Sequence, residues 1–160
     1  LRRPGAIDAV AEHASCGVCL MHMHGEPQTM QLSPLAGDPL PAVRLQLDQV
    51  TGQLLARGVQ ADRIAWDPGI GFGKTPEQNF ALLARQGELL ASGHPLLVGW
   101  SRKSSLGAAT GMPVEERLVP SVAAALLAVE HGAHIVRVHD VRETVAALRV
   151  REAMRAQAVP

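Results

Sequence analysis

Residues 64–78 read IAWDPGIGFGKTPEQ, an apolar run followed by a glycine-rich loop and a helix start. The run from Ile64 to Asp67 is typical of a short buried strand. Thr75 is a favourable N-cap, Pro76 suits the first helical position, and Gln78 can close a capping box. We therefore predict one βα unit here, with a helix that continues to about Ala91.

The same alternation of apolar runs and helical patterns occurs three more times along the chain. Strands that alternate with helices predict a parallel sheet. In chain order, the other predicted elements are a helix at 6–14, a strand at 17–23, a helix at 39–57, a strand at 95–101, a helix at 114–130, a strand at 135–140 and a helix at 140–155.

Helix ends are marked by local signals. Gly58 and Gly132 are expected to stop the helices that precede them. Pro120 lies inside the pattern at 114–130 and should kink that helix or divide it into two pieces. Asp140 and Glu143 have the spacing of a second capping box, so we predict that the last helix begins at Asp140.

Four parallel strands in an open sheet leave two exposed edges, whereas eight βα units close into a barrel of about 250 residues. We therefore interpret residues 1–160 as one α/β domain that forms half of a TIM (β/α)8 barrel. Because half of the site contacts and two strand partners would be missing, we expect these residues alone to be inactive.

The composition excludes several classes of partner. Fifteen Lys and Arg balance fifteen Asp and Glu, so there is no basic field to hold nucleic acid or an anionic membrane. No apolar run approaches the roughly 20 residues of a membrane span, and no signal sequence opens the chain, so we expect a cytoplasmic protein. Cys16 and Cys19 have no second pair, which predicts reduced, buried or half-buried thiols.

Polar residues follow each predicted strand, at the end where (β/α)8 barrels build their active sites. Arg137 and His139 are two apart on a strand and therefore share a face. Beside a helix start at Asp140, they are a candidate anion site that the helix dipole would strengthen. The alternative is an arginine paired with a carboxylate and a histidine in a polar core.

Gly99, Ser101 and Lys103 share a face in the same way, and Gly99 would let a flat ring approach the backbone. Asp67 ends its strand with a carboxylate that can pair with two adjacent N–H groups, such as a guanidine-like edge. The alternative role for Asp67 is that of a turn residue before Pro68. The alternative for Lys103 is a lysine on a loop that points into solvent.

Three other features of the sequence bear on ligand binding. Phe72 is one of only four aromatic residues, and on a glycine-rich loop it has no core to join unless it covers a ligand. The sequence Gly73-Lys74-Thr75 is not a nucleotide phosphate loop, because proline stands at position 68, where that motif needs glycine. His22 and His24 lack a third ligand at matching spacing, so no metal site is predicted.

The segments at 20–31, 67–75, 99–104 and 137–140 together resemble dihydropteroate synthases, in order and spacing, over nearly the whole chain. Ser101-Arg102-Lys103-Ser104 and Arg137-Val138-His139-Asp140 are the most specific parts. The resemblance implies a pterin-binding TIM barrel of folate biosynthesis, of which residues 1–160 would be the C-terminal half, with strands five to eight and without the N-terminal half. Such an enzyme condenses 6-hydroxymethyl-7,8-dihydropterin pyrophosphate with para-aminobenzoate to give 7,8-dihydropteroate and pyrophosphate.

The resemblance also implies residue roles. Arg137 and His139 would surround the pyrophosphate leaving group, Lys103 would donate to the pterin carbonyl, and Asp67 would bind the pterin edge. The remaining substrate contacts would be Met21 at the wall of the pterin pocket, Gly99 beneath a ring, Phe72 on the para-aminobenzoate ring and Ser101 near para-aminobenzoate.

Further implications are Mg²⁺ on the pyrophosphate, held mainly through the other half of the barrel, sulfonamide inhibitors, and a homodimer of the full-length protein. Two alternatives stay open. One is a methyl-folate methyltransferase barrel, which has no need of a pyrophosphate site. The other is a non-catalytic pterin-binding fragment or paralogue.

Overall fold

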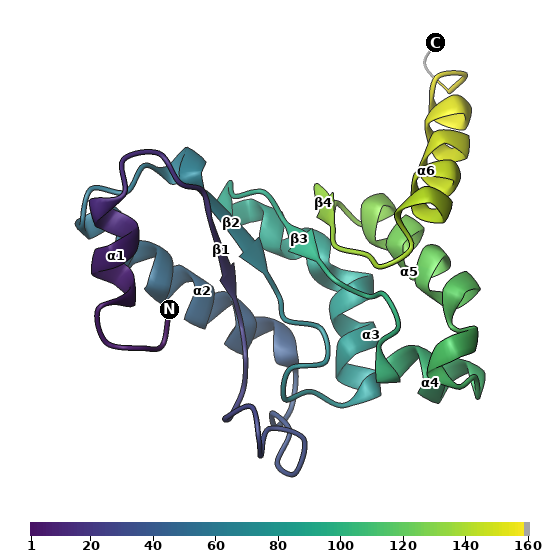
Figure 1. Cartoon of the computed structure of the whole chain (residues 1–160), viewed down its shortest axis with the longest axis horizontal. Helices are drawn as coiled ribbons and strands as arrows, with labels where there is room; N and C mark the ends of the chain where they lie inside the picture. The colour runs from purple at the N-terminus through teal and green to yellow at the C-terminus, as the bar shows by residue number, and fades with distance from the viewer. Residues whose placement is uncertain (159–160) are drawn as a thin grey trace.

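The structure is a computed structural model that describes residues 1–158. Strands and helices alternate along the chain (Figure 1). The elements are α1 (Ala6–Glu12), β1 (Val18–Met21), α2 (Pro39–Ala56), η1 (Ala61–Arg63), β2 (Ile64–Asp67), α3 (Pro76–Arg85), η2 (Gln86–Ser92), β3 (Leu97–Val98), α4 (Ser104–Thr110), η3 (Val114–Glu116), α5 (Leu118–Glu130), β4 (Ile135–Val136) and α6 (Val141–Arg155), where η marks 3-10 helix.

All strand pairs are parallel, as predicted. β1 pairs with β2, with Met21 opposite Asp67, and β3 pairs with β4. The two pairs are joined at Trp66, which bridges to Leu96 and whose backbone N–H donates to the carbonyl of Pro95 at 2.8 Å. The strands therefore lie side by side in the order β1, β2, β3, β4.

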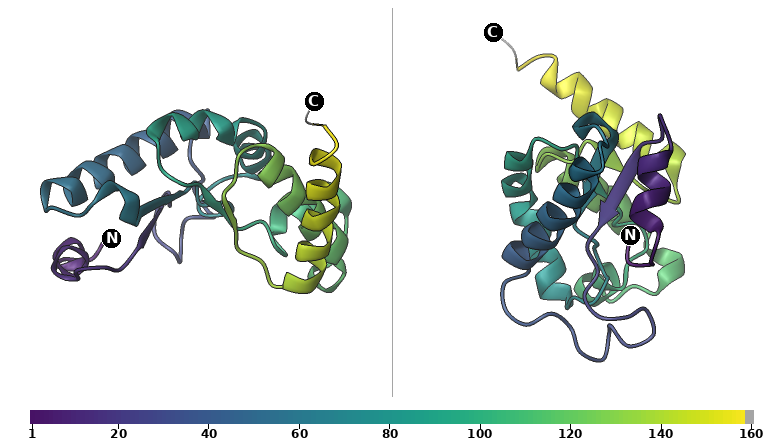
Figure 2. Two further views of the ribbon diagram at one scale, coloured as in Figure 1. Left: turned by 90° about the horizontal axis from the view of Figure 1, so that it is seen from above. Right: turned by 90° about the vertical axis from the view of Figure 1, so that its left-hand side faces the viewer.

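One face of the sheet is packed against helices. Seen from above in Figure 2, the chain forms an arc with α2, α3 and α5 along its outer side and the strands on its inner side. Apolar side chains at alternate strand positions meet the apolar faces of α2 and α3, which removes them from water. The buried cluster includes Leu20, Ile64, Trp66, Leu96 and Val98 from the strand segments and Val43, Leu47, Leu54, Leu82 and Leu83 from the helices.

The opposite face of the sheet is open. Cys19 and Ile135 are exposed, and Met21 and Ala65 are only half-buried. The prediction of a buried or half-buried thiol is correct for Cys16 and wrong for Cys19, because no element of residues 1–158 covers this face at β1. Both thiols are free.

The predicted helix boundaries are partly correct. Both bonds of the capping box between Thr75 and Gln78 form. The α-helix ends at Arg85, however, and the chain continues to Ser92 as a 3-10 helix instead of reaching Ala91 as one α-helix. The pattern at 114–130 is divided into η3 and α5, and Pro120 lies in the first turn of α5, where its missing N–H breaks no helical bond.

Strands β3 (Leu97–Val98) and β4 (Ile135–Val136) are shorter than the predicted strands at 95–101 and 135–140. Helix α4 was not predicted, because its seven residues are too few to show a clear apolar period. None of the helices described for residues 1–158 is long and apolar enough to cross a membrane.

Substituting Thr51→Val should test how β2 is anchored to α2. The buried Thr51 hydroxyl accepts a hydrogen bond of 2.9 Å from the indole N–H of Trp66, which would lose its acceptor inside the core. We expect the free energy of unfolding to fall by about 1–3 kcal/mol, measured by urea denaturation. An unchanged midpoint would contradict this anchoring.

Candidate active site

The predicted site residues of β2, β3 and β4 come together at the carboxyl ends of the strands. Arg137 extends across the open face toward β3, and a Cβ atom added to Gly99 would lie 2.9 Å from its Nη2 atom. Gly99 is buried, and its backbone is closely approached by a flat group, while the predicted ligand ring at this position stays a prediction. In this structure the flat group is the guanidinium of Arg137.

Asp67 is a buried carboxylate among cations. Its Oδ1 atom accepts a hydrogen bond of 2.8 Å from the N–H of Gly69. Asp67 therefore also stabilises the turn that follows it, which is the alternative role that the sequence suggests. Burial raises the pKa of Asp67, while the Gly69 N–H and the charges of Arg137, Lys103 and Lys74 act in the opposite direction. An acceptor in this position suits a ligand edge that carries N–H groups.

Lys103 lies over the ring of Phe72, with Nζ 4.5 Å from the ring centroid. This is a cation–π contact, and it joins the loop after β2 to the loop after β3. Burial and the charge of Arg137 lower the pKa of Lys103, and Asp67 opposes them. Phe72 thus lies next to the predicted site. Its contact with a para-aminobenzoate ring stays a prediction.

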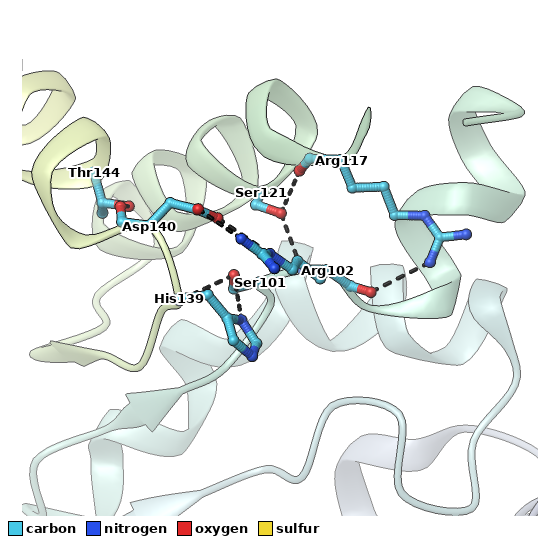
Figure 3. Close-up of polar contacts among 7 residues, drawn as sticks. All are labelled: Ser101, Arg102, Arg117, Ser121, His139, Asp140 and Thr144. Atoms are coloured by element: carbon cyan, nitrogen blue, oxygen red, sulfur yellow. Dashed lines mark hydrogen bonds and ion pairs between the residues drawn. The ribbon is translucent and has the colours of Figure 1, made fainter. Parts of the chain in front are cut away.

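Ser101 and His139 form a pair behind the predicted anion site (Figure 3). The Ser101 hydroxyl lies 2.8 Å from Nδ1 of His139 and accepts a bond of 3.2 Å from the His139 backbone N–H. If the hydroxyl directs its hydrogen at Nδ1, His139 is held in the tautomer with hydrogen on Nε2. In that tautomer Nε2 is a donor for an anion.

The loop between β3 and α4 is held by charged side chains that the sequence did not single out (Figure 3). Arg102 has a φ of 60°, the one positive value among non-glycine residues of the described chain. Its N–H donates to the Ser121 hydroxyl at 2.9 Å, and its carbonyl accepts a bond of 3.3 Å from Arg117. These contacts fix the backbone between Ser101 and Lys103.

The predicted capping box at Asp140 is wrong. The Asp140 carboxylate accepts from Nη2 of Arg102 at 2.8 Å instead of capping α6, and the Thr144 hydroxyl donates to the Asp140 carbonyl at 2.8 Å. The guanidinium of Arg102 reaches both carboxylate oxygens, with Nη2 at 2.8 Å from Oδ1 and Nε at 3.4 Å from Oδ2, and this two-point contact draws the carboxylate away from the helix N–H groups. The Arg102–Asp140 pair therefore joins the loop after β3 to the start of α6.

A second charged group that sequence reasoning missed lies beside Asp67. Lys74 is 3% exposed, and its ammonium contacts Nδ1 of His22 at 2.9 Å and the Gly69 carbonyl at 2.9 Å. Burial, followed by the charge of Lys74, lowers the pKa of His22 to about 3. The only sign of Lys74 in the sequence is its place in a glycine-rich loop. That pattern was compared only with the nucleotide phosphate loop, which it does not match.

Residues 1–158 contain no group of three or more His, Cys, Asp or Glu side chains that could hold a metal ion. His22, one of the two histidines considered as ligands, instead bonds Lys74 through Nδ1. Met21 lies opposite Asp67 in the strand register and is half-buried, which agrees with a place at the wall of the site.

These groups form an open set of cations around a buried carboxylate at the carboxyl ends of parallel strands, which makes this a candidate site for an anionic ligand with a polar ring. The model of the pterin binding enzyme family matches residues 2–139, and the chain belongs to this family.

Solved and curated relatives agree with that assignment. The chain is 45% identical over 153 residues to the dihydropteroate synthase of Escherichia coli strain K12, covering 96% of this chain and 54% of the relative. The dihydropteroate synthase of Burkholderia cenocepacia in complex with 7,8-dihydropteroate is 53% identical, with a TM-score of 0.90 over 98% of this chain and 59% of that one. The Yersinia pestis dihydropteroate synthase in a sulfonamide drug complex is 42% identical, with a TM-score of 0.92 over 97% and 56%. The chain thus spans little more than half the length of these proteins.

The pH dependence of stability should report on Lys74. Burial lowers its pKa from 10.5 to about 7, and Asp67 opposes this shift. Above the lowered value the unfolded chain binds more protons than the folded chain, so the free energy of unfolding should rise with pH. Urea denaturation from pH 7 to about pH 9 should show the wild type gaining stability relative to Lys74→Met. A difference that does not change with pH would contradict the lowered pKa.

Proposed function

We propose that residues 1–160 form the C-terminal half of a TIM (β/α)8 barrel, strands five to eight of a dihydropteroate synthase. The support is the run of four parallel strands with one uncovered face, together with the coverage of about half of each relative. The uncovered face would then line the inside of the closed barrel. Residues 1–160 alone would lack activity, because the substrates would lose the contacts of the other half.

The proposed reaction joins 6-hydroxymethyl-7,8-dihydropterin pyrophosphate to para-aminobenzoate. The bond between the pterin methylene carbon and the pyrophosphate oxygen breaks, a bond from that carbon to the arylamine nitrogen forms, and the amine proton passes to solvent. Pyrophosphate is a good leaving group, so the protein chiefly needs to stabilise the departing anion and align the two reactants. The observation that carries the proposal is the convergence of Arg137, Lys103 and Asp67 at one end of the sheet.

The catalytic roles follow from the charges. Arg137 and the Nε2 atom of His139 would stabilise the pyrophosphate as it leaves, and both side chains are exposed where an anion could approach. Lys103 would donate to the pterin carbonyl, and Asp67 would accept from the amino and ring N–H groups at the opposite end of the pterin edge.

The other proposed substrate contacts are made by uncharged residues. Met21 would form part of the apolar wall, and Phe72 would cover the para-aminobenzoate ring. A ring bound over Gly99 requires the guanidinium of Arg137 to move toward the pyrophosphate. Ser101 would act mainly through His139, to which it is hydrogen bonded. Since a relative is described with a sulfonamide drug, we propose that sulfonamides bind this family member in place of para-aminobenzoate.

A magnesium ion on the pyrophosphate does not fit the donors found here. The strand-end groups nearest the proposed pyrophosphate position are cationic, and residues 1–158 hold no group of three metal-ligating side chains. Protein ligands for Mg²⁺ would therefore come from the other half of the barrel. A homodimer of the full-length protein and a cytoplasmic location also stay predictions.

The reaction can be tested with the full-length enzyme and its two substrates. Wild-type enzyme should form 7,8-dihydropteroate, detected by chromatography. Arg137→Ala removes a charge-assisted bond worth roughly 1.5–3 kcal/mol, so affinity for the pterin pyrophosphate should fall about ten- to a hundredfold. Affinity for the pterin alcohol, which carries no pyrophosphate, should stay the same.

The outcomes separate two claims. Wild-type enzyme that binds pterin without forming product would favour the non-catalytic alternative. An Arg137→Ala variant with unchanged pyrophosphate affinity by calorimetry would reject the anion site.

Asp67→Asn tests the pterin edge. The amide keeps the shape of the carboxylate but replaces one acceptor by a donor, which opposes an N–H edge. Pterin affinity measured by calorimetry should fall while the thermal midpoint changes little. Normal pterin affinity with a collapsed midpoint would mean that Asp67 only shapes the turn through Gly69.

A further inference from the structure

Lys74 is one of only two lysines in the chain, and its ammonium is enclosed by three acceptors. These are Nδ1 of His22 at 2.9 Å, the Gly69 carbonyl at 2.9 Å and the Phe72 carbonyl at 3.2 Å. An ammonium has three N–H donors, so each donor has a partner. Burying a cation is costly unless its hydrogen bonds are made, and here they are made to the loop that carries the proposed ligand contacts.

The loop between β2 and α3 lies directly on the chain that follows β1. A Cβ atom at Gly69 would collide with the carbonyl of His22, and one at Gly73 would collide with the carbonyl of His24. Both glycines have positive φ, at 70° and 68°, so the tight turn and the close approach each require glycine. Through its hydrogen bonds, Lys74 connects the segment after β1 with the loop after β2.

The contacts of Lys74 lead to two proposed substrate residues. The Gly69 residue that offers its carbonyl to Lys74 also donates its N–H to Oδ1 of Asp67. The Phe72 residue that offers its carbonyl holds its ring beneath the ammonium of Lys103. A shift of Lys74 would therefore move the carboxylate and the aromatic ring together.

We propose that Lys74, with His22 as its partner, is a positioning residue that holds Asp67 and Phe72 in place for the two substrates. This inference rests on the proposed function of the site. Lys74 itself is buried and touches neither substrate in this assignment. It acts through the backbone of the loop.

The pair suits this task in either protonation state of Lys74. The lowered pKa of His22 keeps the imidazole neutral, so Nδ1 can accept from the ammonium. A neutral amine would keep two N–H donors for the two carbonyls and could accept from His22 in the tautomer with hydrogen on Nδ1. The loop geometry is thereby retained while Lys74 titrates.

A purely structural lysine would behave differently. If Lys74 only stabilised the fold, its loss would lower the fraction of folded enzyme, which reduces the maximal rate but leaves KM unchanged. If Lys74 positions Asp67 and Phe72, its loss should raise KM for the pterin pyrophosphate and for para-aminobenzoate in enzyme that is still folded. Small displacements of positioning groups cost up to about a hundredfold in rate.

The test compares Lys74→Met with Thr51→Val in the full-length enzyme. Methionine keeps most of the side-chain volume without the charge. We expect Lys74→Met to raise KM for both substrates and Kd for the pterin alcohol by about ten- to a hundredfold. Thr51→Val, which weakens the core on the far face of β2, should lower stability and leave KM and Kd unchanged. His22→Leu removes one of the three acceptors and should raise KM in the same direction by a smaller factor.

Each outcome decides the inference. Folded Lys74→Met with wild-type KM and pterin Kd would overturn it. If Lys74→Met does not fold, an unchanged KM in His22→Leu would overturn it instead, and a raised KM would support it. Failure of the proposed function is recognised separately, because in that case wild-type enzyme forms no dihydropteroate.

Discussion

Strand β2 holds the molecule together, because its backbone pairs with β1 on one side and joins β3 on the other at Trp66. Trp66 fills the core on the helix-covered face and is held by the hydroxyl of Thr51. The next residue, Asp67, points to the open face. A strand has a period of two, so the residue that anchors the core and the residue that faces the ligand are neighbours in sequence. The carboxylate therefore faces the open side of the sheet when the indole is buried on the other side.

Charge at the site is distributed unevenly. A single buried carboxylate, Asp67, is surrounded by Arg137, Lys103 and Lys74, although the whole chain is neutral by count. The proposed anion affinity of the site would come from where the cations are placed and not from a basic protein. Other acidic groups act as supports, such as Asp140, which pairs with Arg102 at the base of the β3 loop. Such a partly exposed pair contributes about 1 kcal/mol or less to stability, so its main effect is on geometry.

Features with local causes were predictable from the sequence. The strand at Ile64, the loop and the capped helix at Thr75 depend on neighbouring residues, and they form as expected. The approach of the Arg137 guanidinium to Gly99 was not predicted, since the sequence suggested a ligand ring at that position. Contacts between distant segments were not predictable in the same way. Asp140 bonds Arg102, 38 residues away, in preference to its own helix, and Lys74 meets His22 across 52 residues.

The exposed thiol of Cys19 lies on the face that a complete barrel would enclose. The accessibility of this sulfur would therefore report whether the barrel is closed. In an isolated half the sulfur would be open to an uncharged alkylating reagent, whereas in the closed barrel the opposing strands would shield it. Cys16, half-buried on the chain that enters β1, would serve as the internal reference for reagent concentration and time. The ratio of labelling at the two thiols would follow the joining of the two halves without any substrate.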